Sequence, residues 1–328
     1  MKRLRLLFDN FSLAVAAVVL VASLLPAQGT AAQVFEGLTY AGIALLFFLH
    51  GARLSRRAII DGAMHWRLHA VVFASTFLMF PLIGLGLSPV LEPVLGNELR
   101  GGVLFLCALP GTVQSAIAFT SIARGNVPAA VCAASASSLV GIIVTPLLVA
   151  LMLGVSAQHA GTGETILKIS TQLLLPFCIG HALRPWIGAW VHRKQRWLRL
   201  VDQGSILLVV YTAFGAAVLS GLWRSVPLSA LLLLSIVCVL LLILALVACT
   251  WVARRLSFGI EDEITIVFCG SKKSMATGIP MAQILFSSAA AGAMILPLML
   301  FHQIQLMVSA ALAARYAQRE EVRPAAGV

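Results

Sequence analysis

The chain has 328 residues, of which 60% are hydrophobic and only 11% carry a formal charge. Soluble globular proteins average about 25% charged residues, so this composition excludes a soluble enzyme, a nucleic-acid-binding arm and a disordered chain. A mean hydropathy of +0.99 indicates instead a polytopic membrane protein. The net charge of +11 does not predict a nucleic-acid partner, because membrane proteins place excess lysine and arginine in cytoplasmic loops.

Ten segments of the chain are apolar enough to be candidate transmembrane helices, each of which needs about 20 mostly apolar residues. In chain order they are residues 11–25, 38–51, 68–87, 101–123, 127–153, 166–183, 204–222, 228–252, 263–286 and 292–315. The second is short, but the basic turns on either side of it require a crossing between them. We therefore predict an all-α protein with ten transmembrane helices.

The positions of the basic residues test this count. With the N-terminus in the cytoplasm, 18 of the 23 basic residues fall on the cytoplasmic side, which predicts an inner-membrane protein with both termini in the cytoplasm. Only Arg100, Lys168 and Arg224 fall outside, and two lysines lie within a span. The predicted cytoplasmic residues are Lys2, Arg3, Arg5, Arg53, Arg56, Arg57, Arg67, Arg124, Arg184, Arg193, Lys194, Arg196, Arg199, Arg254, Arg255, Arg315, Arg319 and Arg323.

The N-terminal segment has an alternative interpretation. Three basic residues, an apolar run and Ala-Gln-Gly-Thr-Ala-Ala at 27–32 also fit a cleaved signal peptide. Cleavage would leave nine spans. Retention is the better prediction, because a retained first span divides the chain into two equal halves.

The two halves predict an inverted repeat, since each contains an odd number of spans. The first would cover residues 1–154 and the second residues 155–316, with a cytoplasmic tail at 317–328. Spans four and nine both contain a run with poor helix-forming residues, at 110–115 and 270–274. Inverted repeats with broken helices in corresponding positions are typical of secondary transporters. Unwound backbone at this depth must be buried in protein or line a water-filled cavity.

The residues at these breaks resemble a known family. Leu-Pro-Gly-Thr-Val-Gln-Ser at 109–115 and Ala-Arg-Gly-Asn-Val at 123–127 resemble the bile acid:sodium symporter family, and Gly-Ser-Lys-Lys-Ser at 270–274 is similar to its sodium/bile acid cotransporter 7-like branch. The resemblance covers essentially the whole chain. It implies a core domain in which broken helices four and nine cross, beside a panel domain. It further implies that organic anions are carried between the two domains by alternating access.

The sequence departs from the pattern of the sodium-coupled members. The resemblance implies oxygen ligands for sodium, but the corresponding positions here read approximately Gln114-Ser115, Ala130, Ala134, Phe268 and Lys272. None of the 12 acidic residues falls in the middle of a predicted span. Bound sodium is therefore disfavoured, and no other metal or cofactor is expected, since the six cysteines form no CxxC pair.

Two adjacent lysines lie at the second break instead. Each would cost roughly 2.5–3.5 kcal/mol at a helix centre, so both need polar partners. We expect the ammonium groups of Lys272 and Lys273 to take the place of sodium, with one of them facing the substrate. An alternative puts both lysines at the cytoplasmic interface, but about ten residues, or roughly 15 Å of helix, separate Lys272 from the start of span nine. The predicted substrate and ion site comprises Thr112, Gln114, Ser115, Ser271, Lys272, Lys273 and Ser274.

Four further residues are secondary candidates for the cavity: Ser135, Ser138, His302 and Gln303. For the serines, close helix packing is the better interpretation, and a single histidine in a bundle is more often structural. The predicted function is sodium-independent transport of a small organic anion across the lipid bilayer. Sodium or proton coupling, with a lysine carrying the proton, is one alternative, and a non-transporting membrane regulator or scaffold is another. A membrane enzyme is not expected, because the sequence offers no paired carboxylates or histidine cluster that would converge at membrane depth.

Overall fold

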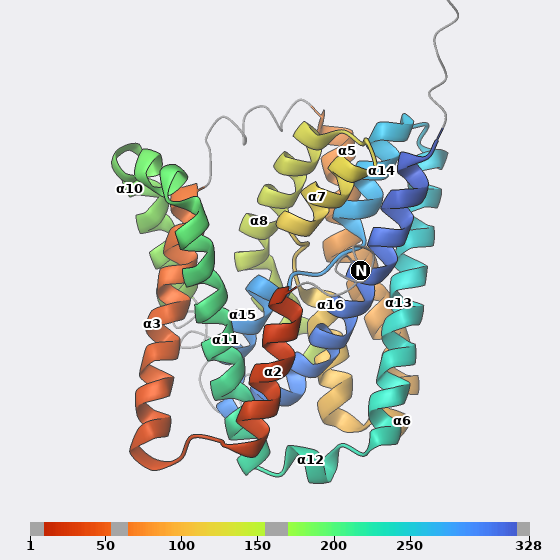
Figure 1. Cartoon of the computed structure of the whole chain (residues 1–328). Helices are drawn as coiled ribbons and strands as arrows, with labels where there is room; N and C mark the ends of the chain where they lie inside the picture. Colours follow the sequence, from red (N-terminus) through yellow and green to blue (C-terminus); the bar gives the residue numbers. More distant parts are fainter. Residues whose placement is uncertain (1–9, 54–64, 155–169, 320–328) are drawn as a thin grey trace, which may run out of the picture.

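The computed structural model describes residues 10–53, 65–154 and 170–319, in which every regular element is a helix (Figure 1). The elements are α2 (Asn10–Leu24), α3 (Gly29–Arg53), α5 (Trp66–Ala74), η2 (Ser75–Met79), α6 (Phe80–Ala108), α7 (Gln114–Ile122), α8 (Val127–Leu153), η3 (Ser170–Leu174), α10 (Leu175–Arg193), α11 (Gln195–Leu219), α12 (Leu222–Ser225), α13 (Leu228–Arg255), α14 (Ile260–Gly270), α15 (Met275–Leu285) and α16 (Ser288–Ala317). The all-α prediction is confirmed for this part of the chain.

Six of the described helical stretches are long and apolar enough to cross a membrane. They are Gly29–Arg53, Trp66–Ala108, Val127–Leu153, Gln195–Leu219, Leu228–Arg255 and Ser288–Ala317. The predicted count of ten needs four further crossings, formed by α2, α10 and the interrupted pairs α6–α7 and α14–α15. None of these is a continuous helix of comparable length and apolarity, so the count of ten stays a prediction.

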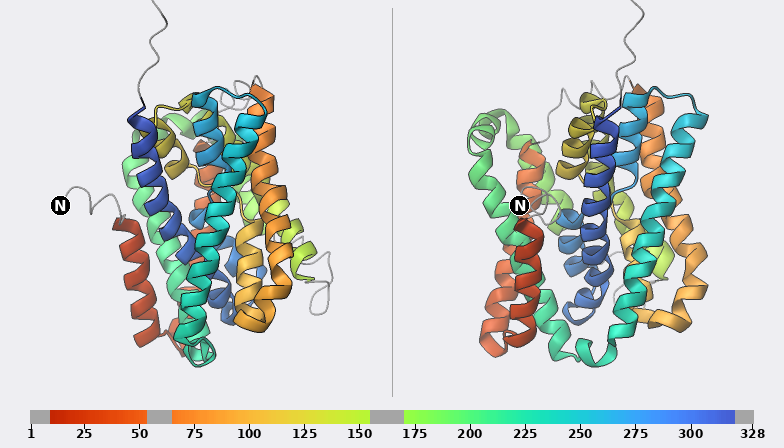
Figure 2. Two further views of the ribbon diagram at one scale, coloured as in Figure 1. Left: turned by 90° about the vertical axis from the view of Figure 1, so that its right-hand side faces the viewer. Right: turned by 45° about the vertical axis from the view of Figure 1, so that its right-hand side comes forward.

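Several predicted boundaries need correction. The stretch from Trp66 to Ala108 contains a non-helical residue, Gly96 (φ 73°, ψ 169°), at which the chain reverses (Figure 2). Helix α3 begins nine residues before the predicted span, and α11 begins at Gln195 rather than at 204. Outside the described residues lie the start of the span predicted at 166–183, most of the tail at 317–328, and the basic residues Lys2, Arg3, Arg5, Arg56, Arg57, Lys168 and Arg323.

The helices form two groups that lie side by side (Figures 1 and 2). One group contains α2, α3, α10 and α11, and the other contains α5 to α8 and α13 to α16. Helix α3 packs closely against α10, and α11 contacts α16 across the boundary between the groups. The site described below lies at this boundary.

Two breaks interrupt the helices of the second group. Helix α6 ends at Ala108, because Leu109 is extended (ψ 153°) before Pro110, as a residue preceding proline prefers. Helix α14 ends at Gly270, and α15 begins after Ser274, whose hydroxyl accepts the Thr277 N–H as an N-cap. The broken segments predicted at 110–115 and 270–274 are therefore observed at 109–113 and 271–274.

The first break packs tightly against α8 through a glycine. A Cβ atom added at Gly141 would lie 2.5 Å from Cβ of Pro110 and 2.7 Å from its Cγ. The proline ring is rigid, so Gly141→Ala is expected to lower stability by about 1–3 kcal/mol. Thermal unfolding of the purified protein followed by fluorescence checks this. Gly86→Ala is the matched control, because no atom lies within 4 Å of its added Cβ. Equal melting temperatures for the two variants would contradict the prediction.

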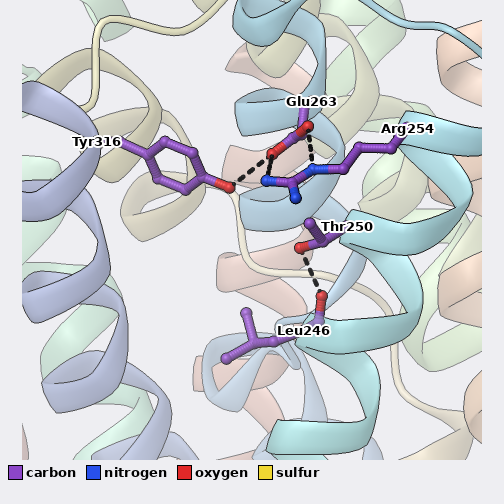
Figure 3. A network of polar contacts seen from close by, with 5 residues as sticks. All are labelled: Leu246, Thr250, Arg254, Glu263 and Tyr316. Carbon is purple, nitrogen blue, oxygen red and sulfur yellow. Dashed lines mark hydrogen bonds and ion pairs between the residues drawn. The ribbon is translucent and has the colours of Figure 1, made fainter. Parts of the chain in front are cut away.

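A polar network joins α13, α14 and α16 near one end of the molecule (Figure 3). Arg254 Nε and Nη2 donate to the two carboxylate oxygens of Glu263 at 2.9 and 3.1 Å, and the Tyr316 hydroxyl donates to Glu263 Oε1 at 3.0 Å. The Glu263 carboxylate is buried but fully partnered. Helices α3, α10 and α16 end at the same end of the molecule, with Arg53, Arg193 and Arg315 near their C-termini (Figure 1). This end is called the basic end below.

Candidate functional site

The two breaks meet at a crossing, where their backbone groups find partners in each other and in α8. Ser274 N donates to the carbonyl oxygen of Pro110 at 2.9 Å, and the Gly111 N–H donates to Ser137 Oγ at 3.2 Å. The Thr145 hydroxyl donates to the carbonyl of Ala108, the last residue of α6, at 2.9 Å. Unwound backbone away from water is tolerated only with such partners. The crossing is therefore a fixed structural element whose buried carbonyl groups accept hydrogen bonds.

Lys273 is enclosed at this crossing, with 0% of its surface exposed. Its Nζ donates to the carbonyl oxygens of Leu109 (2.7 Å), Thr76 (2.8 Å) and Cys107 (2.9 Å). Two of these carbonyls lie at the end of α6, where helix carbonyls lack partners, and Thr76 lies in the π-helical turn η2. The ammonium also lies 4.2 Å from the centre of the Phe80 ring. All three N–H donors are thus used, and the helix end adds a favourable dipole.

Lys272 is equally buried but is bound less completely. Its Nζ donates to the carbonyl oxygen of Ser115 at 3.2 Å and lies 4.0 Å from the Phe119 ring centre and 4.8 Å from that of Phe268. Two aromatic faces can stabilise a desolvated cation. The burial of both lysines rules out their placement at an aqueous interface, which was the alternative derived from the sequence.

The partners of the lysines differ from the expected ones in one respect. Hydroxyl groups make up much of the predicted site, but within the described residues every hydrogen bond of the two ammonium groups goes to a main-chain carbonyl. The hydroxyls bond elsewhere, because each finds a nearer partner within its own segment. Ser115 Oγ donates to Thr112 Oγ1 at 2.8 Å, and Ser271 Oγ donates to the carbonyl of Val267 at 2.5 Å.

A glutamine that the sequence did not single out holds the second break. Gln305 Oε1 accepts the N–H of Lys273, and Gln305 Nε2 donates to the Lys273 carbonyl, both at 2.9 Å. Its amide nitrogen also lies 2.9 Å from His302 Nδ1. We had named Gln303, which is only partly buried. The helical spacing from His302 to Gln305 places both on one face of α16, which is the signal that could have found Gln305.

A cavity of about 420 Å³ opens beside the crossing, between the two helix groups. Among the predicted residues, it is lined by Thr112, Gln114, Ser115, Ser135, Ser138, Ser274 and His302. Ser271, Lys272, Lys273 and Gln303 do not line it. The expectation that one lysine faces the substrate therefore does not describe this conformation. Both lysines lie behind the cavity wall, where they fix the position of the crossing.

The opposite wall of the cavity carries charged side chains that were predicted to lie at the cytoplasmic ends of spans. His50 and Arg53 of α3 and Arg199 and Asp202 of α11 line this wall. Arg53 Nη1 pairs with Asp202 Oδ2, whereas Arg53 Nε and Nη2 are buried and have no hydrogen-bond partner among the described residues. Asp202 was placed before span seven, but α11 begins earlier and carries it into the wall. The net charge of these two arginines and one aspartate is positive, which favours an anionic ligand.

Comparison with known proteins identifies relatives of this chain. The model of the SBF-like CPA transporter family matches residues 9–318.

The chain belongs to this family.

Its relatives include the "Putative symporter YfeH" of Escherichia coli, 56% identical over 98% of this chain and 96% of that protein. A Pseudomonas aeruginosa protein designated PA2026 is 63% identical over 99% and 98% of the two chains. "Sodium/bile acid cotransporter 7" of Xenopus tropicalis is 29% identical over 84% and 81%. The resemblance found from the two breaks is thus confirmed, and the chain is an integral membrane transporter of the SBF-like family.

The structure places the residues at which the sequence departs from the pattern of the sodium-coupled members. Ala130 and Ala134 are buried on α8 and offer no side-chain oxygen. Phe268, at the approximate position of one of the implied oxygen ligands, has its ring centre 4.8 Å from the Lys272 ammonium. Of the positions that depart from the sodium-coupled pattern, Ser115 and Phe268 contact the Lys272 amine.

Proposed function

We propose that this SBF-like protein carries a small organic anion by alternating access between its two helix groups. The proposal includes ten spans in two inverted repeats, at 1–154 and 155–316, in an inner membrane with both termini in the cytoplasm. Each half of the chain contains one interrupted helix pair, α6–α7 in the first and α14–α15 in the second, which supports the repeat. The name of the Xenopus relative, which mentions a bile acid, supports an organic anion as the substrate class.

The observation that carries this proposal is the cavity between the two groups. Its crossing-side wall provides hydroxyl and amide groups, and its α3–α11 wall provides the guanidinium groups of Arg53 and Arg199. Within the described part of the chain, two nitrogens of Arg53 have no hydrogen-bond acceptor, and guanidinium groups bind carboxylates and sulfonates in a bidentate manner. An anion bound between the walls would touch both groups, so its binding would depend on how they sit relative to each other.

We further propose that transport is independent of sodium, because Lys273 takes the place of a bound cation. Three carbonyl oxygens within 2.9 Å of one positive centre form the kind of oxygen cage that a sodium ion would need. Lys272 adds a second fixed charge between aromatic rings. With two ammonium groups in a protein-enclosed space, a further cation beside them would be repelled. We expect no cofactor and no resident metal.

Uptake into proteoliposomes tests both parts of the proposal. Taurocholate and a panel of smaller carboxylates and sulfonates serve as probes, each measured in sodium chloride and in choline chloride. We expect uptake of at least one anion, at the same rate in both salts. A sodium-specific increase would contradict the lysine substitution while leaving the carrier intact. An uptake that follows an imposed pH gradient would indicate proton coupling, and failure of every anion would favour a regulator or scaffold.

A further inference from the structure

A second cavity lies outside the proposed substrate path, between α13 and α16. It has a volume of about 910 Å³ and shares no lining residue with the cavity described above. It opens on the outer surface of the helix bundle, where Val247 and Trp251 are 61% and 64% exposed. In a membrane protein an outer apolar surface at this position meets lipid rather than water. The cleft is therefore accessible to a lipid molecule.

The two ends of the cleft differ in chemistry. Its inner part is an apolar trough formed by Leu246 and Val247 of α13 and Val308 and Leu312 of α16. Its rim at the basic end is formed by arginines of the same two helices. Nine residues separate Leu246 from Arg255, which is about 13 Å along a helix. A ligand that fills the cleft must have an apolar part of roughly this length and a negatively charged group at one end.

The arginines of the rim are not equivalent, as Figure 3 makes clear for Arg254. Arg254 is bound by both oxygens of Glu263, so its charge is neutralised. Arg255 and Arg315 are exposed, and within the described part of the chain no ion pair is recorded for either. The Arg254–Glu263–Tyr316 network also fixes the two helices that carry them. The rim therefore presents two uncompensated positive charges on a rigid support.

We infer that this cleft binds an anionic phospholipid, with its phosphate between Arg255 and Arg315 and an acyl chain in the trough. Basic pockets between transmembrane helices bind lipid headgroups in this way. Trp251, an exposed indole at the rim, suits the headgroup level, where its N–H can donate to a phosphate or ester oxygen. A zwitterionic lipid would not neutralise the two arginines. The inference does not depend on which anion the protein carries.

Native mass spectrometry of the delipidated protein tests the inference. The protein is titrated with phosphatidylglycerol, phosphatidylcholine or inorganic phosphate, and the variant Arg255→Gln/Arg315→Gln is compared with Arg193→Gln/Arg196→Gln. The control pair removes the same charge from exposed positions at the same end, outside the cleft. We expect one phosphatidylglycerol to bind more tightly than phosphatidylcholine, and about thirtyfold more weakly in the cleft variant only.

Three results would overturn the inference. Equal weakening in the control variant would mean that the attraction comes from the basic end as a whole rather than from the cleft. Saturation by inorganic phosphate, with no gain from the acyl chain, would identify a free-anion site. A dimer that persists when lipid is added, and that dissociates in the cleft variant, would identify a second copy of the chain as the occupant. Melting temperatures measured in parallel establish that both variants are folded.

Discussion

Replacing Lys273 with methionine is expected to prevent recovery of folded protein, whereas Lys272→Met is expected to leave the fold intact. The Lys273 ammonium is the hydrogen-bond donor to three buried carbonyl oxygens, from Thr76, Cys107 and Leu109. An unsatisfied buried acceptor costs about 1–3 kcal/mol, so three of them approach the whole net stability of a folded protein, about 5–15 kcal/mol. These carbonyls belong to two different parts of the chain, η2 and the end of α6, which the Lys273 amine joins to the second break.

Lys272 is the matched comparison for this experiment because it is equally buried but less involved in hydrogen bonding. Removing its amine takes the lysine hydrogen-bond donor away from one carbonyl group, that of Ser115. A methionine side chain fits against the Phe119 and Phe268 rings, since its sulfur packs well on aromatic groups. The measurement is fluorescence-detected size exclusion of the solubilised variants, followed by thermal unfolding. Equal recovery of the two variants would show that the carbonyl cage does not depend on the Lys273 amine.

Replacing Arg199 with glutamine is expected to raise the KM for the transported anion by about tenfold to a hundredfold, with the melting temperature unchanged. Arg199 lines the cavity and is exposed, and within the described residues no ion pair is recorded for it. Its charge is therefore available to the ligand. A hydrogen bond to a charged group contributes about 1.5–3 kcal/mol, and each 1.4 kcal/mol corresponds to a factor of ten in affinity.

The control for this substitution lies on the same helix. Arg196→Gln removes an equal charge from α11 at an exposed position that does not line the cavity. Concentration-dependent uptake into proteoliposomes gives KM and the maximal rate for each variant. A similar rise in KM for both variants would indicate general electrostatic attraction by the basic end. An unchanged KM for Arg199→Gln would remove this residue from the proposed anion site.

The two breaks could be located from the sequence because they depend on local residue chemistry. Pro110 and its extended neighbour end one helix, and the Gly-Ser-Lys-Lys-Ser run at 270–274 ends another, so proline, glycine and hydroxyl residues carried the signal. The partners of Lys273 could not be found in this way. They are main-chain carbonyls, which every residue possesses, and one of them becomes available through a π-helical turn that has no clear sequence signature.

The charged wall of the cavity was missed for a different reason. Arg53 and Arg199 lie where basic residues are expected, near the predicted cytoplasmic ends of spans. The orientation of the protein in the membrane was therefore a sufficient explanation for their charges. Only the packing of α3 against α10 and of α11 beside them turns both side chains toward the crossing. A charge that explains topology can therefore also serve a site, and sequence position alone does not separate the two roles.

The tethered amine of Lys273 has an energetic consequence for the direction of transport. An amine that is part of the chain cannot be released on either side of the membrane, so on the proposed mechanism a monovalent substrate crosses without a compensating ion. An electrical potential of about 100 mV, negative inside, then changes its free energy by ~2.3 kcal/mol. At equilibrium this corresponds to a concentration roughly fiftyfold higher outside than inside. Such a protein would act as an exporter driven by membrane voltage.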